Sequence, residues 1–458
     1  MTLATNSRLT KAWRVPWDRL VQGHQVNLAF ADQALVSGAN FAAGILFARS
    51  LGLFEFGRFT LAWIVVEFSA SLQYAAILQP MLNVGPKQAD GEAARYYDAA
   101  LIQQGAFSLV CMLLVGGGAA AVARLYPSLH IGDLALPMGI AVAGHQLQFF
   151  VRRYFFARER PGIAFLIDSC RYVVQLGATI GLAISMPLAM SGPTALWIVG
   201  GSAMLAAVLG GWLVGRVHWN RAAMTEAVRR HWHFAKWALP SAAMYLLAGQ
   251  TSMLVAGAVL GAATAGAMNA AKTILGVVNI LLLALDNFAP SQASRALVLA
   301  GHEAFRTYLR RLAIGVAALT TGVVILLNLD PGYLIHLVFG SQYNGLGYLV
   351  PWYSAACFIY SMSAVLVIRA AALERTKAIF VSYASAAVVA IVFAYPLARF
   401  GGVIGILAGA VFTEIVRFVT LALQVRRVRR YLFARLAAPK RALGLLVVTA
   451  ATTDPADR

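Results

Sequence analysis

Charged side chains occur inside long apolar segments of this sequence. Eight lie well within such segments, and a ninth, Arg369, lies near the end of another; the eight are Asp32, Glu67, Asp168, Arg171, Lys272, Asp286, Glu414 and Arg417. A charge in apolar surroundings is costly unless it pairs, faces the protein interior or lines water. These residues are therefore the first candidates for binding or coupling chemistry.

Two of the acids precede an arginine by three residues. Asp168 and Arg171 form one such pair, and Glu414 and Arg417 form the other. Residues three apart share a helix face. Each pair is either a local ion pair that makes the helix cheaper to insert, or an arginine that faces a cavity and is held there by its acid. A guanidinium in a cavity would bind phosphate oxygens bidentately.

Lys272 has no acid three or four residues away, so no local pair explains it. Its ammonium either extends along the helix to the nearer interface or faces a central cavity, and we favour the cavity. Asp286 lies near the opposite end of the same segment, where an interfacial position is compatible with its charge.

Asp32 and Glu67 each lie about two helical turns inside an apolar segment. A buried carboxylate that exchanges a proton or a cation could couple an ion gradient to movement of another molecule. Each could equally hydrogen-bond to a neighbouring helix. His145 has the same two interpretations, and we favour a packed polar residue.

The composition requires lipid around these segments. The chain has 458 residues, of which 60% are hydrophobic and 12% charged. A membrane helix needs about 20 apolar residues. This predicts an all-α polytopic membrane protein with twelve spans, at 26–48, 59–80, 99–122, 135–156, 162–186, 195–214, 237–259, 267–289, 311–329, 348–371, 378–398 and 401–424.

The basic residues predict the orientation of the spans. The chain has 37 lysines and arginines. Of these, 30 fall on the same side of the membrane as the N-terminus, 4 fall on the opposite side, and 3 lie within spans. Basic residues accumulate on the cytoplasmic side. Both termini are therefore predicted to be cytoplasmic. The net charge of +19 is explained in this way, and no nucleic-acid partner is expected.

An internal repeat divides the chain into two halves. Leu51-Gly52-x4-Gly57 recurs as Leu260-Gly261-x4-Gly266, and Glu92-x-x-Arg-x-Tyr recurs from Glu303. The offset is 209 to 211 residues. Six spans per half predict two six-helix bundles related by a pseudo-twofold axis along the membrane normal. The predicted parts are a leader at 1–25, bundles at 26–214 and 237–424, a basic amphipathic linker helix at 215–236 and a basic tail at 425–458.

Several kinds of chemistry have no sequence signal. The chain has no phosphate-binding GxxxxGK[ST] motif, no HExxH and no cysteine–histidine cluster. We therefore expect a transporter that is not an enzyme, without a cofactor or a bound metal.

The chain resembles the polysaccharide-transporter branch of the multidrug/oligosaccharidyl-lipid/polysaccharide (MOP) flippase superfamily. The resemblance is carried by Phe30-Ala31-Asp32-Gln33, Phe41, Ala48-Arg49-Ser50-Leu51-Gly52 with Phe56-Gly57, and the segment from Asp286 to Pro290. It implies a V-shaped pair of bundles, a bacterial inner membrane, and alternating access driven by an ion gradient or the membrane potential. The implied substrate is an undecaprenyl-diphosphate-linked oligosaccharide for O-antigen or exopolysaccharide, handled beside other polysaccharide assembly proteins.

For the cavity, the resemblance implies basic residues around the diphosphate, and Arg171, Lys272, Arg369 and Arg417 are the positions that could supply them. Two alternatives stay open. A drug/cation antiporter of the same superfamily would need an acid-dominated cavity. An integral-membrane glycosyltransferase or polymerase usually has a large outer loop, whereas the longest here, 330–347, holds only one acid and one histidine.

Overall fold

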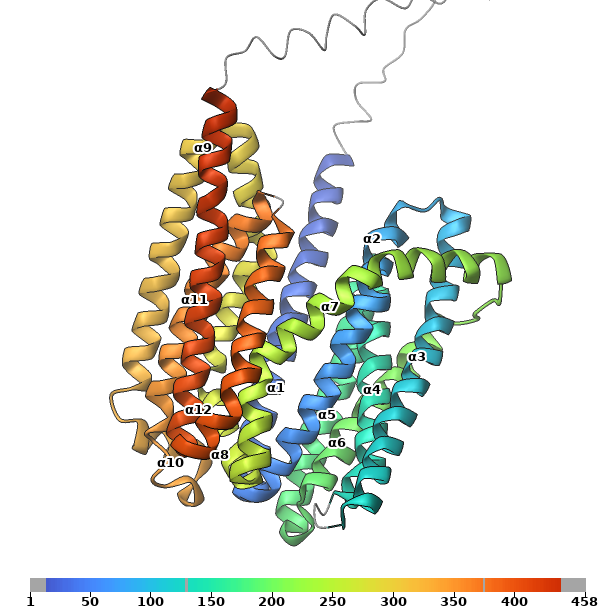
Figure 1. Ribbon diagram of the computed structural model, residues 1–458. Helices are drawn as coiled ribbons and strands as arrows, with labels where there is room; N and C mark the ends of the chain where they lie inside the picture. Colours follow the sequence, from blue (N-terminus) through green and yellow to red (C-terminus); the bar gives the residue numbers. More distant parts are fainter. Residues whose placement is uncertain (1–13, 128–130, 374, 438–458) are drawn as a thin grey trace, which may run out of the picture.

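The computed structural model describes residues 14–127, 131–373 and 375–437, and within these ranges it contains helices and no strand (Figure 1). Side chains before Asn27 and after Arg426 lie outside the described part. The predicted leader at 1–25 and the tail at 425–458 therefore remain predictions.

The helices form two bundles. The first contains α1 (Arg14–Gln73), the π-helix η1 (Tyr74–Leu78), α2 (Gln79–Val84), η2 (Gly85–Lys87), α3 (Asp90–Leu125), α4 (Gly132–Ala157), α5 (Pro161–Ser185), η4 (Pro187–Ala189) and α6 (Gly192–Val214). The second contains α7 (Arg221–Leu260), α8 (Ala262–Ile274), α9 (Gly276–Leu327), α10 (Pro331–Phe339), η5 (Ser341–Tyr343), α11 (Leu349–Ala372) and α12 (Thr376–Ala437).

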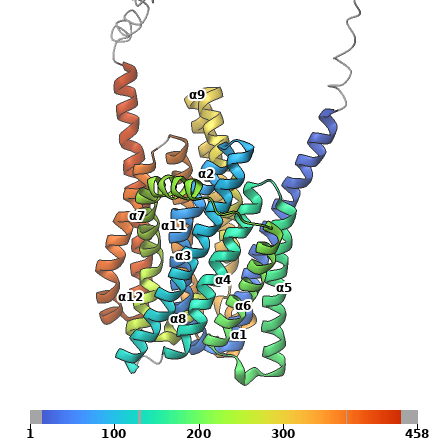
Figure 2. The ribbon, with the colours of Figure 1, turned by 90° about the vertical axis from the view of Figure 1, so that its right-hand side faces the viewer.

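The bundles converge at one end of the molecule and diverge at the other (Figure 1). The described chain ends, on α1 and α12, both point away from the end of convergence (Figure 2). We call the end of convergence the closed end and the opposite end the open end.

The described residues hold nine helical segments long and apolar enough to cross a membrane. Two of these, Asn27–Lys87 and Thr376–Arg426, each contain two helices joined at a kinked glycine, Gly52 or Gly402. Eleven predicted spans fall within these segments. The remaining one, 267–289, is divided between α8 and α9 at Leu275. The chain is thus a multi-pass membrane protein, while a count of twelve uninterrupted spans is not confirmed.

The two copies of the Leu-Gly-x4-Gly repeat meet at the closed end. Gly52 and Gly261 begin the two turns with φ of 72° and 96°, a conformation that favours glycine. Five residues later, Gly57 and Gly266 allow the two backbones to touch. A Cβ built on Gly57 would lie 1.7 Å from the carbonyl oxygen of Ala262, and one on Gly266 would lie 2.2 Å from that of Leu53.

Polar contacts also join the bundles at the closed end. The Arg49 guanidinium donates to the carbonyl oxygens of Leu337 and Val338 in α10, the latter at 2.6 Å. The Tyr343 hydroxyl donates to the carbonyl oxygen of Ala48 at 2.8 Å. The first helix is therefore fixed to the second bundle beside the glycine crossing.

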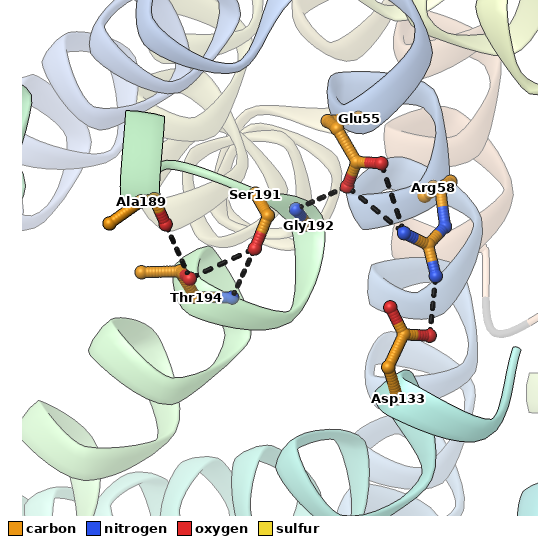
Figure 3. Close-up of polar contacts among 7 residues, drawn as sticks. All are labelled: Glu55, Arg58, Asp133, Ala189, Ser191, Gly192 and Thr194. Atoms are coloured by element: carbon orange, nitrogen blue, oxygen red, sulfur yellow. Dashed lines mark hydrogen bonds and ion pairs between the residues drawn. The ribbon is translucent and has the colours of Figure 1, made fainter. Parts of the chain in front are cut away.

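At the closed end, an ion-pair network also joins helix ends of the first bundle (Figure 3). Arg58 of α1 pairs with Glu55 at 2.9 Å and with Asp133 of α4 at 2.5 Å. Glu55 also accepts a hydrogen bond from the backbone N–H of Gly192 at 2.7 Å, at the start of α6. Ser191 caps α6 by accepting from the N–H of Thr194. These contacts make α1, α4 and α6 one rigid unit at the closed end.

The predicted linker at 215–236 contains the start of α7, which crosses the first bundle near the open end (Figure 1). Asn220 caps this helix by accepting from the N–H of Ala223 at 2.9 Å. Ala227 and His231 are buried, whereas Trp232 is exposed. The Tyr96 hydroxyl of α3 lies 2.8 Å from Nε2 of His231. The linker is thus amphipathic, with its apolar face on the first bundle.

This buried histidine predicts a pH effect on stability. Burial lowers the pKa of His231 to about 4, against 6.5 for an exposed histidine. Protons then bind preferentially to the unfolded state between these values, so stability falls as pH falls below about 6.5. We expect the wild type to lose about 2 kcal/mol more than His231→Gln between pH 7.5 and pH 5. The measurement is the denaturation midpoint of the detergent-purified proteins at the two pH values. Equal pH dependence of the wild type and His231→Gln would contradict the lowered pKa of His231.

Candidate functional site

A cavity of about 890 Å³ lies between the two bundles. Its wall comes from α1, η1 and α4 on one side and from α7 and α12 on the other. Glu67, His145 and Gln250 are among its polar residues, and Tyr245 and Tyr383 are among its aromatic residues. The π-helix η1 is part of the wall, and π-bulges occur often at functional sites. The cavity is thus lined by mixed aromatic and polar groups at the interface of the bundles.

Behind the first-bundle wall, Arg152 joins two buried acids. Its Nη2 lies 2.5 Å from Oδ2 of Asp32 in α1, and its Nε lies 2.5 Å from Oδ2 of Asp168 in α5. The three side chains are almost completely buried, with 8%, 0% and 1% exposed. Arg152 lies near the end of the predicted span 135–156, where a basic residue is common at the membrane interface, so the sequence alone does not indicate this role.

Arg171 does not pair with the acid three residues before it. Among the described residues no ion pair joins Asp168 to Arg171, so the local-pair interpretation is wrong here. Gln148 of α4 lies between them, donating to Asp168 at 2.5 Å and accepting from Arg171 at 2.6 Å. Nη2 of Arg171 lies 3.2 Å from Nδ1 of His145, which lines the cavity. The guanidinium is therefore one residue from the cavity surface.

Arg417 of the second bundle keeps its local acid. Its Nη2 lies 2.7 Å from Oε2 of Glu414, as the spacing of three allows. The guanidinium carbon also lies 4.5 Å from the ring centroid of Tyr360 and 5.5 Å from that of Tyr383, which lines the cavity. This arginine too is one residue behind the wall, but its charge is partly balanced.

Lys272 lies in the last turn of α8, directly before the helix breaks at Leu275. It makes no hydrogen bond or ion pair within the described part of the chain. Glu67 and Glu414 are close enough for electrostatic interaction with it. Glu67 itself accepts from Trp63 at 3.1 Å and from Gln250 at 3.3 Å. Lys272 is thus a half-buried base at a helix break, held among acids of both bundles.

No described contact links the two further candidates, Arg369 and Asp286, to this group. Arg369 lies nine residues after Tyr360 on α11, about 14 Å along the helix, and it is not among the described residues that line the cavity. The side chain of Asp286 lies outside the described residues. The structure therefore brings Arg171, Lys272 and Arg417 towards one cavity, whereas the role of Arg369 at this cavity stays a prediction.

Such an arrangement suits an anion. Three bases approach the cavity, and each interacts with a residue of its wall. Arg171 contacts His145, Arg417 lies against Tyr383, and Lys272 interacts electrostatically with Glu67. Asp32 and Asp168 are occupied by Arg152, so they do not neutralise Arg171 directly. Guanidinium and ammonium groups bind phosphate oxygens through charge-assisted hydrogen bonds.

Comparisons with known proteins define the family and the fold. Residues 46–348 match the family described as "Polysaccharide biosynthesis protein". No curated protein matches the chain. The fold is similar to that of an inward-facing multidrug resistance MATE family transporter of the MOP superfamily, with a TM-score of 0.68, 14% identity, and coverage of 87% of this chain and 96% of that one.

Two further solved structures share this fold. The inward closed lipid II flippase MurJ gives a TM-score of 0.63 at 12% identity, covering 88% of this chain and 87% of that one. An outward-facing structure with the same MATE description gives only 0.55 at 14% identity, covering 89% and 96%. With two thirds of its length matched, the chain belongs to the polysaccharide biosynthesis protein family and has the transporter fold of the MOP superfamily.

Proposed function

We propose that this transporter flips an undecaprenyl-diphosphate-linked oligosaccharide across the bacterial inner membrane for O-antigen or exopolysaccharide synthesis. The observation that carries the proposal is the convergence of Arg171, Lys272 and Arg417 on one cavity between the bundles. In this proposal the open end and both termini face the cytoplasm, and the cavity accepts the diphosphate and the first sugars. The polyprenyl chain stays in lipid.

Lys272 is the central residue of the proposed site. It lacks a direct ion-pair partner in the described part, so its positive charge is the most available to a ligand. Its position before a helix break resembles the interrupted helices that form binding sites in other transporters. Without substrate, Glu67 and Glu414 stabilise the Lys272 ammonium electrostatically. An entering diphosphate would replace them as its partner.

A proton or cation is the proposed driving ligand. The Asp32–Arg152–Asp168 cluster holds two acids and one base, which leaves one negative charge uncompensated within the cluster. Glu67 provides a carboxylate on the cavity wall itself. We propose that one of these acids carries the coupling ion, and that return of the ion resets the bundles after release of the glycan.

The first test is Lys272→Ala. We expect at least about a tenfold loss of substrate affinity, because a charge-assisted contact is worth about 1.5–3 kcal/mol. Surface polysaccharide of cells that depend on the variant should fall accordingly. The measurement is surface glycan by immunoblot, normalised to the amount of transporter in the membrane.

Two variants serve as controls for this test. Lys272→Arg keeps the charge and should retain part of the export. Arg399→Ala removes an exposed base of α12 far from the cavity wall and should export normally. Normal export by Lys272→Ala would refute the anionic site. If loss of the transporter left surface glycan intact and raised sensitivity to cationic drugs, the antiporter alternative would replace the proposal.

A further inference from the structure

We infer that Arg153 of α4 is the first contact for the phosphate groups of the substrate, at a separate position near the open end of the cavity. This inference rests on the proposed function and extends it to a residue that the sequence analysis did not select. It gives the cavity two anion positions, one at Arg153 and one at Arg171 and Lys272.

Arg153 continues the face of α4 that lines the cavity. His145, Phe149 and Arg153 are spaced by four residues, so they follow one stripe of the helix. The first two line the cavity. The guanidinium carbon of Arg153 lies 5.3 Å from the ring centroid of Phe149. Tyr74, another wall residue, is close enough to interact electrostatically with Arg153.

The neighbouring Arg152 shows what a purely structural arginine looks like in this helix. It follows Gln148 on a different stripe, turned towards α5, and its guanidinium pairs directly with two acids, Asp32 and Asp168. Arg153 has no ion pair or hydrogen bond within the described residues, and its Nε is buried without a partner. Asp32 and Asp168 interact with Arg153 electrostatically, but both make their ion pairs with Arg152 instead. A half-buried guanidinium without a direct ion-pair partner is costly for folding alone, which favours a binding role.

The position of Arg153 separates it from the deeper bases. Eight residues, or about 12 Å along α4, lie between it and His145. Asp133, at the start of α4, contacts Arg58 at the closed end. Arg153 therefore lies on the side of the open end, and a ligand from that side reaches it before Arg171. A planar guanidinium stacked on an aromatic ring suits a phosphate ester at this point.

The test measures binding to the purified full-length protein by native mass spectrometry, with undecaprenyl diphosphate as the probe. Arg153→Ala should lower the affinity about tenfold. Arg153→Lys should recover part of it. Arg160→Ala, which removes an exposed base from the turn after α4, should bind like the wild type. Gel filtration of each variant verifies that the protein is folded.

Phosphatidylglycerol provides the second arm, because a phospholipid headgroup carries the same phosphate chemistry. If Arg153→Ala weakened only phosphatidylglycerol binding, Arg153 would be a lipid contact and the inference would fail. It would also fail if Arg153→Ala bound the diphosphate normally while Lys272→Ala did not, and the proposed function would then survive. If Lys272→Ala also bound normally, the proposed function itself would be refuted.

Discussion

Arg152→Ala is expected to destabilise the protein by about 3–5 kcal/mol, the usual cost of breaking a buried ion pair by removing one partner. The variant would leave Asp32 and Asp168 without their shared base, and both carboxylates are almost completely buried. Two like charges would then face each other in a medium of low dielectric. Most of the variant should be lost from the membrane by degradation.

The measurement compares the denaturation midpoint in detergent and the amount of protein in the membrane. Arg153→Ala, one residue away, is the matched control, because it removes an arginine without breaking an ion pair in the described structure. It should keep a nearly normal midpoint. Arg152→Lys should rescue only partly, because one ammonium cannot reproduce the Nε and Nη2 contacts to two acids.

A second comparison separates charge from packing. Combining Arg152→Met with Asp32→Asn and Asp168→Asn removes all three charges together. Buried ion clusters replaced by neutral residues are often as stable as the original. We expect this triple variant to recover much of the lost stability but to fail in transport if one of the acids carries the coupling ion. Equal stability of Arg152→Ala and the wild type would show that the cluster is not a structural ion pair.

The architecture was largely predictable from the sequence, because each property involved is local. Apolar runs long enough to span are imposed by the thickness of the bilayer. The all-α class is confirmed by the structure, and the comparisons confirm the polysaccharide biosynthesis protein family and a fold shared with MOP superfamily transporters. The Leu-Gly-x4-Gly repeat was visible because Gly52 and Gly261 need a positive φ, and Gly57 and Gly266 need to have no Cβ.

The partners of the buried charges were not predictable. Spacing shows which residues can meet on one helix, but it does not show how that helix is rotated against its neighbours. Asp168 lies within reach of Arg171, yet α4 brings Arg152 and Gln148 closer. A rotation of 100° per residue also separates Arg152, which faces acids, from Arg153, which follows the cavity stripe. The four-residue spacing of His145, Phe149 and Arg153 did indicate that these three residues share one stripe of the helix.

Gly57→Ala is expected to prevent the closed end from closing. The added Cβ would lie 1.7 Å from the carbonyl oxygen and 2.5 Å from the carbonyl carbon of Ala262. Both are backbone atoms, so no side chain can rotate to make room. The two helices must move apart, and the equilibrium should shift away from the arrangement described here. Because the proposed alternating access needs both arrangements, we expect transport to be almost completely lost.

Spin labels on the two bundles can measure this shift. Leu188 in η4 and Tyr333 in α10 are both exposed, and each could carry a label after substitution by cysteine. The native Cys111, Cys170 and Cys357 would first be replaced. The distance between the labels should lengthen in Gly57→Ala.

Gly201→Ala is the matched control, because a Cβ there meets no atom within 4 Å. It should leave both the distance and transport unchanged. Gly266→Ala should reproduce the effect of Gly57→Ala, since its Cβ would meet the carbonyl oxygen of Leu53 across the same crossing. If Gly57→Ala gave the wild-type distance and normal export, the crossing would not control closure. The repeat would then mark only a turn, and the conformational change would have to act through the contacts of Arg49 and Tyr343 instead.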